Sequence, residues 1–179
     1  GFMREVNGKT TLVHDANHKV RSDYTIEDPQ LMRTLSSLVS RRLTPMIQRA
    51  FQFQVTRMER YIVACYEAET GGHFSAHRDN TTKGTAHRRF AVSINLNAEE
   101  FDGGDLSFPE FGPRRYRPPT GGAVVFSCSL LHQAWPATRG IRYAFLPFLY
   151  DDAAAEIRER NNDFLGDGTT PYQREGDRI

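Results

Sequence analysis

The sequence predicts a mainly β fold, a barrel or sandwich braced by α-helices. From residue 51 onward apolar side chains recur with a period of two, in many short runs separated by Gly, Pro, Asn and Asp. One clear amphipathic helix precedes these runs, and a shorter helix follows them. Short strands of this kind bury one face each, so the β region is expected to close on itself or to stack two sheets.

The first predicted helix begins at Asp28-Pro29. Aspartate is a favoured N-cap residue, and proline fits the first helical position because its missing N–H would be unpaired there in any case. Apolar side chains then recur at helical spacing, at Leu31, Leu35, Leu38, Val39, Leu43, Met46 and Ile47. Pro45 lies within this pattern, so the helix is expected to kink or divide there.

Strands are predicted where apolar runs alternate between turn residues, at 52–56, 59–67, 88–96, 105–108, 114–117, 122–127 and 140–149. The stretches DGGDLSF and PPTGGAVVF each place a turn directly before an apolar strand. A last helix is predicted to begin at Asp151 and to run through AAAEIRERN. The tail from Gly166 onward shows no periodicity and is assigned no role.

Length and composition indicate one globular domain. The chain has 179 residues, of which 39% are hydrophobic and 25% charged, and this balance excludes a disordered protein. We expect the domain to span 1–179, with a core at about 20–150, a helical C-terminal extension at 151–165 and an irregular tail at 166–179. The formal net charge of +1 provides no overall field toward nucleic acid or membrane.

The two cysteines and the absence of a long apolar run indicate where the protein works. No apolar stretch approaches the roughly 18 residues of a membrane span. Cys65 and Cys128 both lie in apolar strand-like runs, and a secreted scaffold would use more cysteines. We therefore expect free thiols and a cytoplasmic location.

The stretch GGHFSAHRDN contains two histidines and an aspartate within seven positions. On a helix, His73 and His77 would lie on one face like the zinc ligands of an HExxH metalloprotease. Phe74 stands where such an enzyme has its glutamate base, and Gly71-Gly72 disfavour a helix. We therefore do not expect His73 to be a ligand; it is expected at the surface or in support of the ligands.

In an extended segment, residues two apart point to the same face, so His77 and Asp79 can converge on one ion. His132 follows the apolar strand GGAVVFSCSLL and is the best third ligand, whereas His87 lies in a polar turn and is predicted to be a surface residue. Taken alone, His132 would more often be a hydrogen-bonded core histidine. Two histidines and one carboxylate leave three coordination positions open, which suits Fe(II) that binds a co-substrate and O₂. A structural zinc site would use four protein ligands.

Arg142 lies ten residues after His132, inside the apolar strand GIRYAFLPFLY. By alternation it shares a face with Ala144 and Leu146, and the small alanine leaves room beside the guanidinium. An arginine in such a run needs an anionic partner. One interpretation is a buried structural salt bridge, and the other is a bidentate clamp on a ligand carboxylate.

In this order, His77-x-Asp79, His132 and Arg142, with GGDLSF and GGAVVF between them, resemble the Fe(II)/2-oxoglutarate dioxygenases of the prolyl-4-hydroxylase-like branch. The resemblance covers roughly residues 20–150 and implies a double-stranded β-helix, a jelly-roll or cupin-like fold. It implies that His77, Asp79 and His132 bind iron and that Arg142 holds the distal carboxylate of 2-oxoglutarate. Tyr66, in ACYEAETGG, matches a tyrosine that adds a hydrogen bond to the co-substrate.

The resemblance also implies the chemistry. It implies Fe(II), 2-oxoglutarate and O₂, with ascorbate as a stimulant, and hydroxylation of an unactivated C–H bond with release of succinate and CO₂. An amino acid, a peptidyl side chain and a natural-product scaffold remain open as substrates. Asp79 favours oxygenation, because related halogenases have a small residue there. The alternative is a non-catalytic module of a larger protein that binds or senses the metal and 2-oxoglutarate.

Two further expectations concern partners. DNA-repair demethylases of the superfamily have a second arginine six positions beyond the first, where this chain has Phe148, so nucleic acid is not expected as a substrate. Asn80, Trp135 and Arg139 are candidates for the substrate mouth. The segment KVRSDYTI resembles the substrate-side segment of this branch. A helix usual upstream of it is not found, and we expect a fused or upstream domain beyond this chain.

Overall fold

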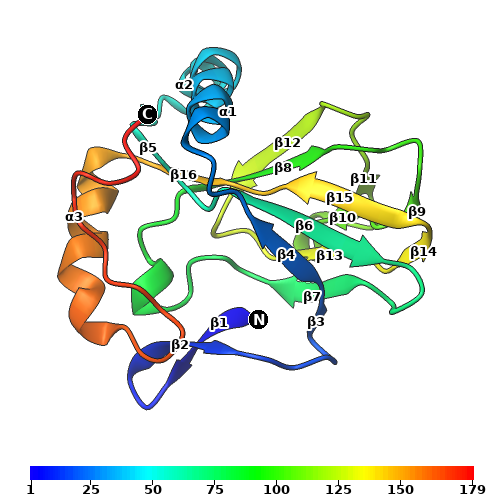
Figure 1. Ribbon diagram of the computed structural model, residues 1–179, viewed down its shortest axis with the longest axis horizontal. Helices are drawn as coiled ribbons and strands as arrows, with labels where there is room; N and C mark the ends of the chain where they lie inside the picture. The colour runs from blue at the N-terminus through cyan, green and yellow to red at the C-terminus, as the bar shows by residue number, and fades with distance from the viewer.

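The computed structural model describes residues 1–179 and is mainly β, as predicted (Figure 1). The larger sheet contains β4 (Ser22–Thr25), β5 (Arg57–Glu59), β6 (Ile62–Glu67), β8 (Phe90–Asn95), β12 (Ala123–Ser127), β15 (Ile141–Phe145) and β16 (Phe148–Tyr150). Its strand order is β4-β6-β15-β8-β16-β5, and β12 pairs with β8. All of these pairings are antiparallel.

The smaller sheet contains β3 (Lys19–Val20), β7 (His73–His77), β10 (Leu106–Ser107), β11 (Arg115–Tyr116) and β13 (His132–Ala134), in the order β11-β10-β13-β7-β3. Two short ribbons complete the β structure. One pairs β1 (Phe2–Val6) with β2 (Lys9–Val13), and the other pairs β9 (Asp102–Gly103) with β14 (Ala137–Arg139).

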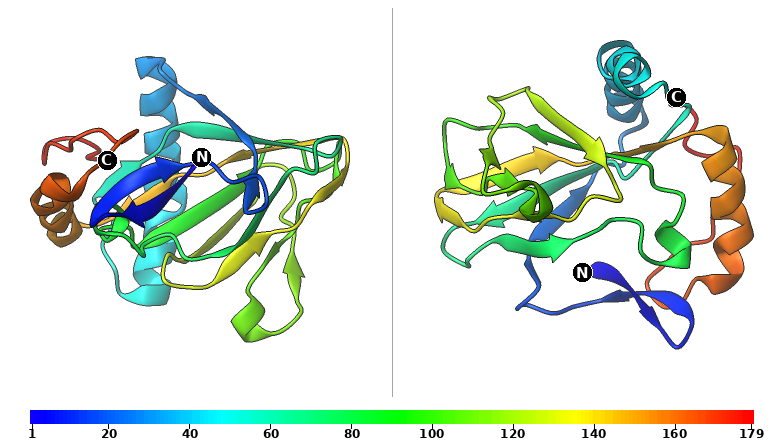
Figure 2. Two further views of the ribbon diagram at one scale, coloured as in Figure 1. Left: turned by 90° about the horizontal axis from the view of Figure 1, so that it is seen from below. Right: turned by 180° about the vertical axis from the view of Figure 1, so that it is seen from behind.

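The helices are α1 (Pro29–Arg42), α2 (Thr44–Phe51) and α3 (Asp152–Arg160), with short 3-10 helices η1 (Lys83–Thr85), η2 (Pro109–Phe111) and η3 (Asn161–Phe164). Helices α1 and α2 cover the larger sheet, whereas the β1–β2 hairpin lies on the opposite side of the barrel (Figures 1 and 2). Val39 and Ile47 of these helices are buried in one cluster with Phe90, Phe145 and Leu149 of the sheet. None of the helices combines the length and the apolar character that a membrane span requires.

The helix predictions are confirmed at their ends. The Asp28 side chain accepts a hydrogen bond from the backbone N–H of Gln30 at 2.9 Å, so it caps α1 as expected. The helix divides at Leu43, and Pro45 lies in the first turn of α2. At the other end of the chain, Asp151 caps α3 through the N–H of Ala154.

Three strand predictions are corrected. Residues 52–56 form no strand, because Gln52 ends α2 in the left-handed conformation with φ of 53°. The run 59–67 is broken at Arg60, which also has a left-handed φ of 67°, and strand β6 begins only at Ile62. The run 140–149 is split into β15 and β16 around Pro147, whose ring cannot donate a ladder hydrogen bond.

The β1–β2 hairpin was not predicted. Its turn is Asn7-Gly8, where both residues have positive φ, 51° and 75°. The backbone of β2 also contacts the C-terminal tail, because Gly166 donates to Thr10 and Leu12 donates to Asp167. The tail to which no role was assigned therefore fixes one side of this hairpin.

Candidate iron and co-substrate site

The pairing of β7 with β13 brings the three predicted ligands together. His77 ends β7, His132 opens β13, and the two are direct partners in the antiparallel register. Asp79 follows His77 by two residues, and its backbone N–H bonds the carbonyl of Cys128. The Nε2 atoms of His77 and His132 lie 3.3 and 3.4 Å from the two carboxylate oxygens of Asp79. One ligand atom from each residue lies within 4.8 Å of the others, so the group can hold a metal ion.

The backbone fixes the tautomer of both imidazoles. Nδ1 of His77 lies 2.7 Å from the carbonyl oxygen of Ser75, and Nδ1 of His132 lies 3.1 Å from that of Leu130. A carbonyl oxygen can only accept, so each Nδ1 carries the proton. Each Nε2 therefore presents a lone pair toward Asp79, which is the arrangement that a metal-ligating histidine requires.

Electrostatics favour the protonation states that a metal needs. Burial acts to raise the pKa of Asp79, but the neighbouring His77, His132 and Arg88 outweigh it, and the pKa lies below its ordinary value. Burial lowers the pKa of His132 and so favours its neutral form. The ring of Phe74 stacks on His77 with centroids 3.6 Å apart, which further restricts the ligand's orientation.

Arg142 points into the same cavity as the three ligands. Polar and apolar side chains both line this cavity. The polar ones include His77, Asp79, His132, Tyr66, Ser93 and Arg142, and the apolar ones include Phe126, Leu146 and Phe148. Arg142 is 4% exposed, shares its face of β15 with the fully buried Ala144, and is the direct partner of Tyr66 on β6. The predicted alternation of this strand is confirmed.

The partners of Arg142 are all neutral. Its Nε donates to Oδ1 of Asn95 at 3.0 Å, and one Nη donates to Oγ of Ser93 at 2.9 Å. The guanidinium also lies 5.1 Å from the centre of the Tyr66 ring, and no carboxylate forms an ion pair with it. Burial lowers the pKa of Arg142. The structural salt bridge is therefore not present, because no carboxylate lies within ion-pair distance of this buried cation.

Gly104 explains why the stretch GGDLSF matters to this cavity. Its φ is 66°, and a Cβ atom there would lie 2.9 Å from Cδ of Arg142. Any larger residue would be strained in its backbone and would press on the arginine stem. Tyr66, in turn, accepts a hydrogen bond from Arg21 at 3.1 Å, so its hydroxyl is oriented from the segment before α1.

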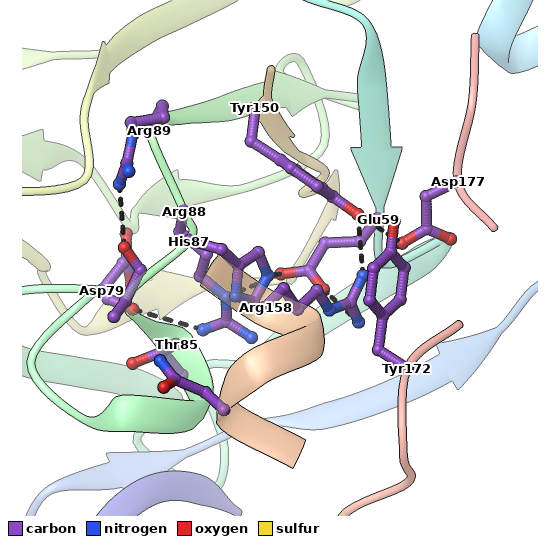
Figure 3. A network of polar contacts seen from close by, with 12 residues as sticks. Glu59, Asp79, Thr85, His87, Arg88, Arg89, Tyr150, Arg158, Tyr172 and Asp177 are labelled. Carbon is purple, nitrogen blue, oxygen red and sulfur yellow. Dashed lines mark hydrogen bonds and ion pairs between the residues drawn. The ribbon is translucent and has the colours of Figure 1, made fainter. Parts of the chain in front are cut away.

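A buried charge network lies directly behind Asp79 (Figure 3). Arg88 donates to the backbone carbonyl of Asp79 at 3.3 Å and to Glu59 at 2.8 Å. Glu59 also bonds Nε2 of His87 at 3.0 Å and pairs with Arg158 of α3 at 2.7 Å. Burial alone would raise the pKa of Glu59, but Arg88, His87 and Arg158 hold that pKa well below its ordinary value.

This network contradicts the prediction for His87, which is 1% exposed and not a surface residue. The polar turn GTAHRRF gave no indication of burial, because the partners Glu59 and Arg158 are distant in the sequence.

The remaining candidates lie away from the cavity. His73 bonds backbone carbonyls of Gly71 and Asn17 and is not in the metal-binding group, as predicted. Asn80 bonds Ser129, Trp135 bonds Ser107, and Arg139 pairs with the exposed Asp102. None of these three is among the residues that line the cavity or the cleft beside it, and their place at the substrate mouth stays a prediction.

A wide cleft leads from the metal-binding group to the surface. His77 and Asp79 line both the cavity and the cleft, together with Phe74 and Arg60. The walls of the cleft come from the β1–β2 hairpin, the segment around Lys19 and the C-terminal tail. The buried ligand group is therefore reached from the side on which the hairpin lies (Figure 2).

Residues 61–150, half of the chain, match the family described as the 2OG-Fe(II) oxygenase superfamily. The chain belongs to this superfamily. The match contains His77, Asp79, His132, Arg142 and Tyr66. The metal and co-substrates of the superfamily are Fe(II), 2-oxoglutarate and O₂, and the donor set of two neutral imidazoles and one carboxylate fits Fe(II).

Curated relatives of this oxygenase chain are bacterial proteins named PKHD-type hydroxylases. One from Synechococcus sp. (strain JA-2-3B'a(2-13)) is 31% identical over 108 residues, which are 55% of this chain and 47% of the relative. One from Nitrosomonas europaea is 30% identical over 132 residues, 68% of this chain and 56% of the relative. The chain spans about half the length of the curated relatives that it matches.

Solved structures show the same fold. A prolyl hydroxylase from Trichoplax adhaerens, in complex with a peptide fragment of hypoxia inducible factor, superposes with a TM-score of 0.64 at 21% identity and covers 82% of this chain and 71% of its own. A prolyl-4-hydroxylase from Pseudomonas putida gives 0.59 at 21% identity, covering 74% and 73%. The oxygenase chain therefore has the double-stranded β-helix fold that the resemblance implied.

Proposed function

We propose that this chain carries a hydroxylase that uses Fe(II), 2-oxoglutarate and O₂ to place one oxygen atom in a C–H bond of its substrate. The second oxygen atom is incorporated into succinate, and CO₂ is released. The observation that carries the proposal is Arg142, a buried cation without a carboxylate partner, in one cavity with a group of two histidines and an aspartate.

His77, Asp79 and His132 are the proposed iron ligands. Their Nε2 atoms and carboxylate are already directed at one another, and the Nδ1 protons are held by backbone carbonyls. Bound Fe(II) would supply the oxidative chemistry, and these three side chains would hold it while leaving room for 2-oxoglutarate and O₂. Asp79 is the only anionic ligand, so it partly neutralises the metal and sets its affinity.

Arg142 and Tyr66 are the proposed co-substrate residues. Arg142 uses Nε and one Nη for Asn95 and Ser93, and these bonds fix the plane of the guanidinium. The remaining N–H groups are free to donate to the distal carboxylate of 2-oxoglutarate. Tyr66 lies beside the same guanidinium and can donate its hydroxyl proton to that carboxylate.

Apolar side chains around the metal-binding group exclude water. Leu106, Phe126, Leu146 and Phe148 line the cavity between the iron ligands and Arg142. A dry cavity strengthens the ion pair between Arg142 and the co-substrate, and the exclusion of water also prevents side reactions.

We further propose a cytoplasmic location, which is supported by Cys65 and Cys128, both free thiols. For the substrate, the peptide bound by the Trichoplax adhaerens relative supports a peptidyl or amino-acid group over a nucleic acid.

The decisive experiment is an anaerobic and aerobic comparison of co-substrate turnover. With Fe(II) and O₂ the purified protein should convert 2-oxoglutarate to succinate, and a chelator should stop the conversion. A protein that binds 2-oxoglutarate but never forms succinate, with any peptide or amino acid tested, would instead be a binding or sensing module.

A further inference from the structure

Five of the basic side chains that line the cleft and the adjoining cavity form ion pairs with Asp23 or Glu59: Lys19, Arg21, Arg60, Arg88 and Arg158. Arg158 also pairs with Asp177. Glu59 is fully engaged by Arg88 and Arg158. The other three side chains, Lys19, Arg21 and Arg60, form ion pairs with Asp23 alone.

Asp23 cannot neutralise all three of its neighbours. Arg21 engages it closely: Nη2 donates to it at 2.7 Å, and Nε lies 2.5 Å from its other carboxylate oxygen. Arg60 approaches it only to 3.5 Å and Lys19 only to 3.9 Å. Arg60 and Lys19 are therefore cations with a distant, already occupied partner.

Arg60 is held in an unusual backbone conformation. Its φ of 67° is left-handed, a conformation that is strained for any residue other than glycine. Residues in strained backbone conformations cluster at active sites and ligand-binding sites. The Arg60 side chain is 31% exposed, and it lines both the metal-containing cavity and the cleft outside it. Burial and the neighbouring Arg88 and Arg21 lower the pKa of Arg60 to about 10.

Lys19 lies on the other side of Phe74, the residue that stacks on His77. Its Nζ lies 4.9 Å from the Phe74 ring centre, and its side chain is 3% exposed. Nζ donates to the backbone carbonyl of Gly1 at 2.5 Å. Burial and the charge of Arg21 lower the pKa of Lys19 to about 7, and an anion bound beside Lys19 would stabilise its charged form.

The co-substrate does not supply that anion. In the proposed function on which this inference rests, the charges of Fe(II), Asp79, Arg142 and 2-oxoglutarate cancel one another. Lys19 also lines only the cleft, not the cavity that contains Arg142. The excess positive charge therefore faces the position of the substrate to be oxidised.

We propose that Arg60 and Lys19 form a substrate-anion subsite, in which a carboxylate of the substrate is bound beside the iron. The carboxylate is either a free α-carboxylate of an amino-acid-like molecule or the side chain of an acidic residue in a peptide. Both have the same chemistry, and the subsite distinguishes them from neutral analogues because an amide brings no charge to the two cations.

The experiment measures binding to the anaerobic complex of enzyme, Fe(II) and saturating 2-oxoglutarate, so that no acid can enter the co-substrate position. One series contains N-acetyl amino acids and their primary amides. A second series contains capped tripeptide amides with a central Glu or Gln. Calorimetry gives each Kd, and perturbation of the metal-to-2-oxoglutarate absorption band reports binding next to the metal.

At least one carboxylate should bind ten- to a hundredfold more tightly than the corresponding neutral amide. This ratio is typical of a charge-assisted hydrogen bond at a partly exposed site. Arg60→Gln should reduce this ratio to about threefold or less, and Lys19→Gln should lower it independently. The matched control is Arg49→Gln, an exposed arginine of α2. A preference for the acid in the first series would identify an α-carboxylate as the bound group, and a preference for Glu over Gln in the second would identify an acidic side chain.

Two results overturn the subsite. One is a panel in which no carboxylate binds more tightly than its amide, including a panel in which nothing binds. The other is a preference for acids that survives intact in both variants. Either result leaves the proposed function standing if the wild-type protein still forms succinate from 2-oxoglutarate, whereas loss of succinate formation in wild type refutes the proposed function itself.

Discussion

Two buried clusters of charge lie on either side of the Asp79 backbone, and they differ in whether their charges are paired. Around Glu59, each cation has an anion within hydrogen-bond distance: Arg88 at 2.8 Å and Arg158 at 2.7 Å. In the cavity, Arg142 has only the neutral Asn95 and Ser93. A complete network stabilises the protein by itself, whereas an incomplete one is balanced only when a ligand binds. The difference separates structural charges from functional ones.

The largest effect is expected from Asp79→Ala, which removes the only anion among the proposed ligands. Fe(II) binding should weaken sharply and succinate formation should be abolished. Fe(II) titration and a succinate assay measure the two effects. Chelation should inactivate the wild-type protein equally, and added Fe(II) should rescue wild type but not the variant. Activity retained by Asp79→Ala would remove this residue from the metal site.

The next effect tests the unpaired arginine. Arg142→Met keeps most of the side-chain volume but leaves the distal carboxylate of 2-oxoglutarate without a partner, a loss of about 2–5 kcal/mol. The KM for 2-oxoglutarate should rise about thirtyfold to several thousandfold. Replacing an unpaired buried cation by an apolar side chain should change the free energy of unfolding by less than about 1 kcal/mol. Denaturant unfolding and 2-oxoglutarate titration are measured on the same preparation.

The opposite outcome for Arg142→Met would contradict the comparison. A variant that unfolds easily yet keeps wild-type dependence on 2-oxoglutarate would show that Arg142 stabilises the fold and does not bind the co-substrate.

Glu59→Gln should show the reverse pattern, because it breaks a paired network. Arg88 and Arg158 would lose their shared carboxylate, and the free energy of unfolding should fall by about 3–5 kcal/mol. Glu156→Gln, in the exposed pair with Arg174, is the matched control and should cost less than about 1 kcal/mol. Equal costs in both variants would show that the buried network carries no special stability.

The pH dependence gives an independent readout of Glu59. Its pKa in the folded protein lies well below its ordinary value of 4.5. The stabilisation is therefore fully present above about pH 4.5 and is lost as the pH falls through the folded-state pKa. The stability difference between wild type and Glu59→Gln should shrink with acidification below that pH, and unfolding curves between pH 7 and pH 3 measure it.

The smallest effect is expected at His73. It contacts only backbone carbonyls and lies outside the metal-binding group, so His73→Ala should cost less than about 1 kcal/mol and leave Fe(II) affinity unchanged. Loss of metal equal to that of Asp79→Ala would show that the ligand set includes His73.

Local spacing was sufficient to predict much of the site. The spacing of two residues puts His77 and Asp79 within reach of one ion, and alternation along β15 turns Arg142 toward the cavity. The turn at Asn7-Gly8 has the composition of a tight hairpin and could have predicted β1–β2.

Other features depend on partners that no local pattern contains. His87 is buried because Glu59 and Arg158 come from distant elements. The division of 59–67 depends on the left-handed conformation of Arg60, and arginine as a residue type does not indicate it. Ascorbate stimulation and an additional upstream domain stay predictions.

The left-handed conformation of Arg60 has a consequence for the evolution of this protein. Glycine or asparagine would adopt a φ of 67° with less strain, so either substitution should make the fold more stable by about 1 kcal/mol. A library selected only for resistance to heat should therefore lose the arginine at this position. A library selected for turnover of an acidic substrate should keep it, and the two selections would diverge at one codon between β5 and β6.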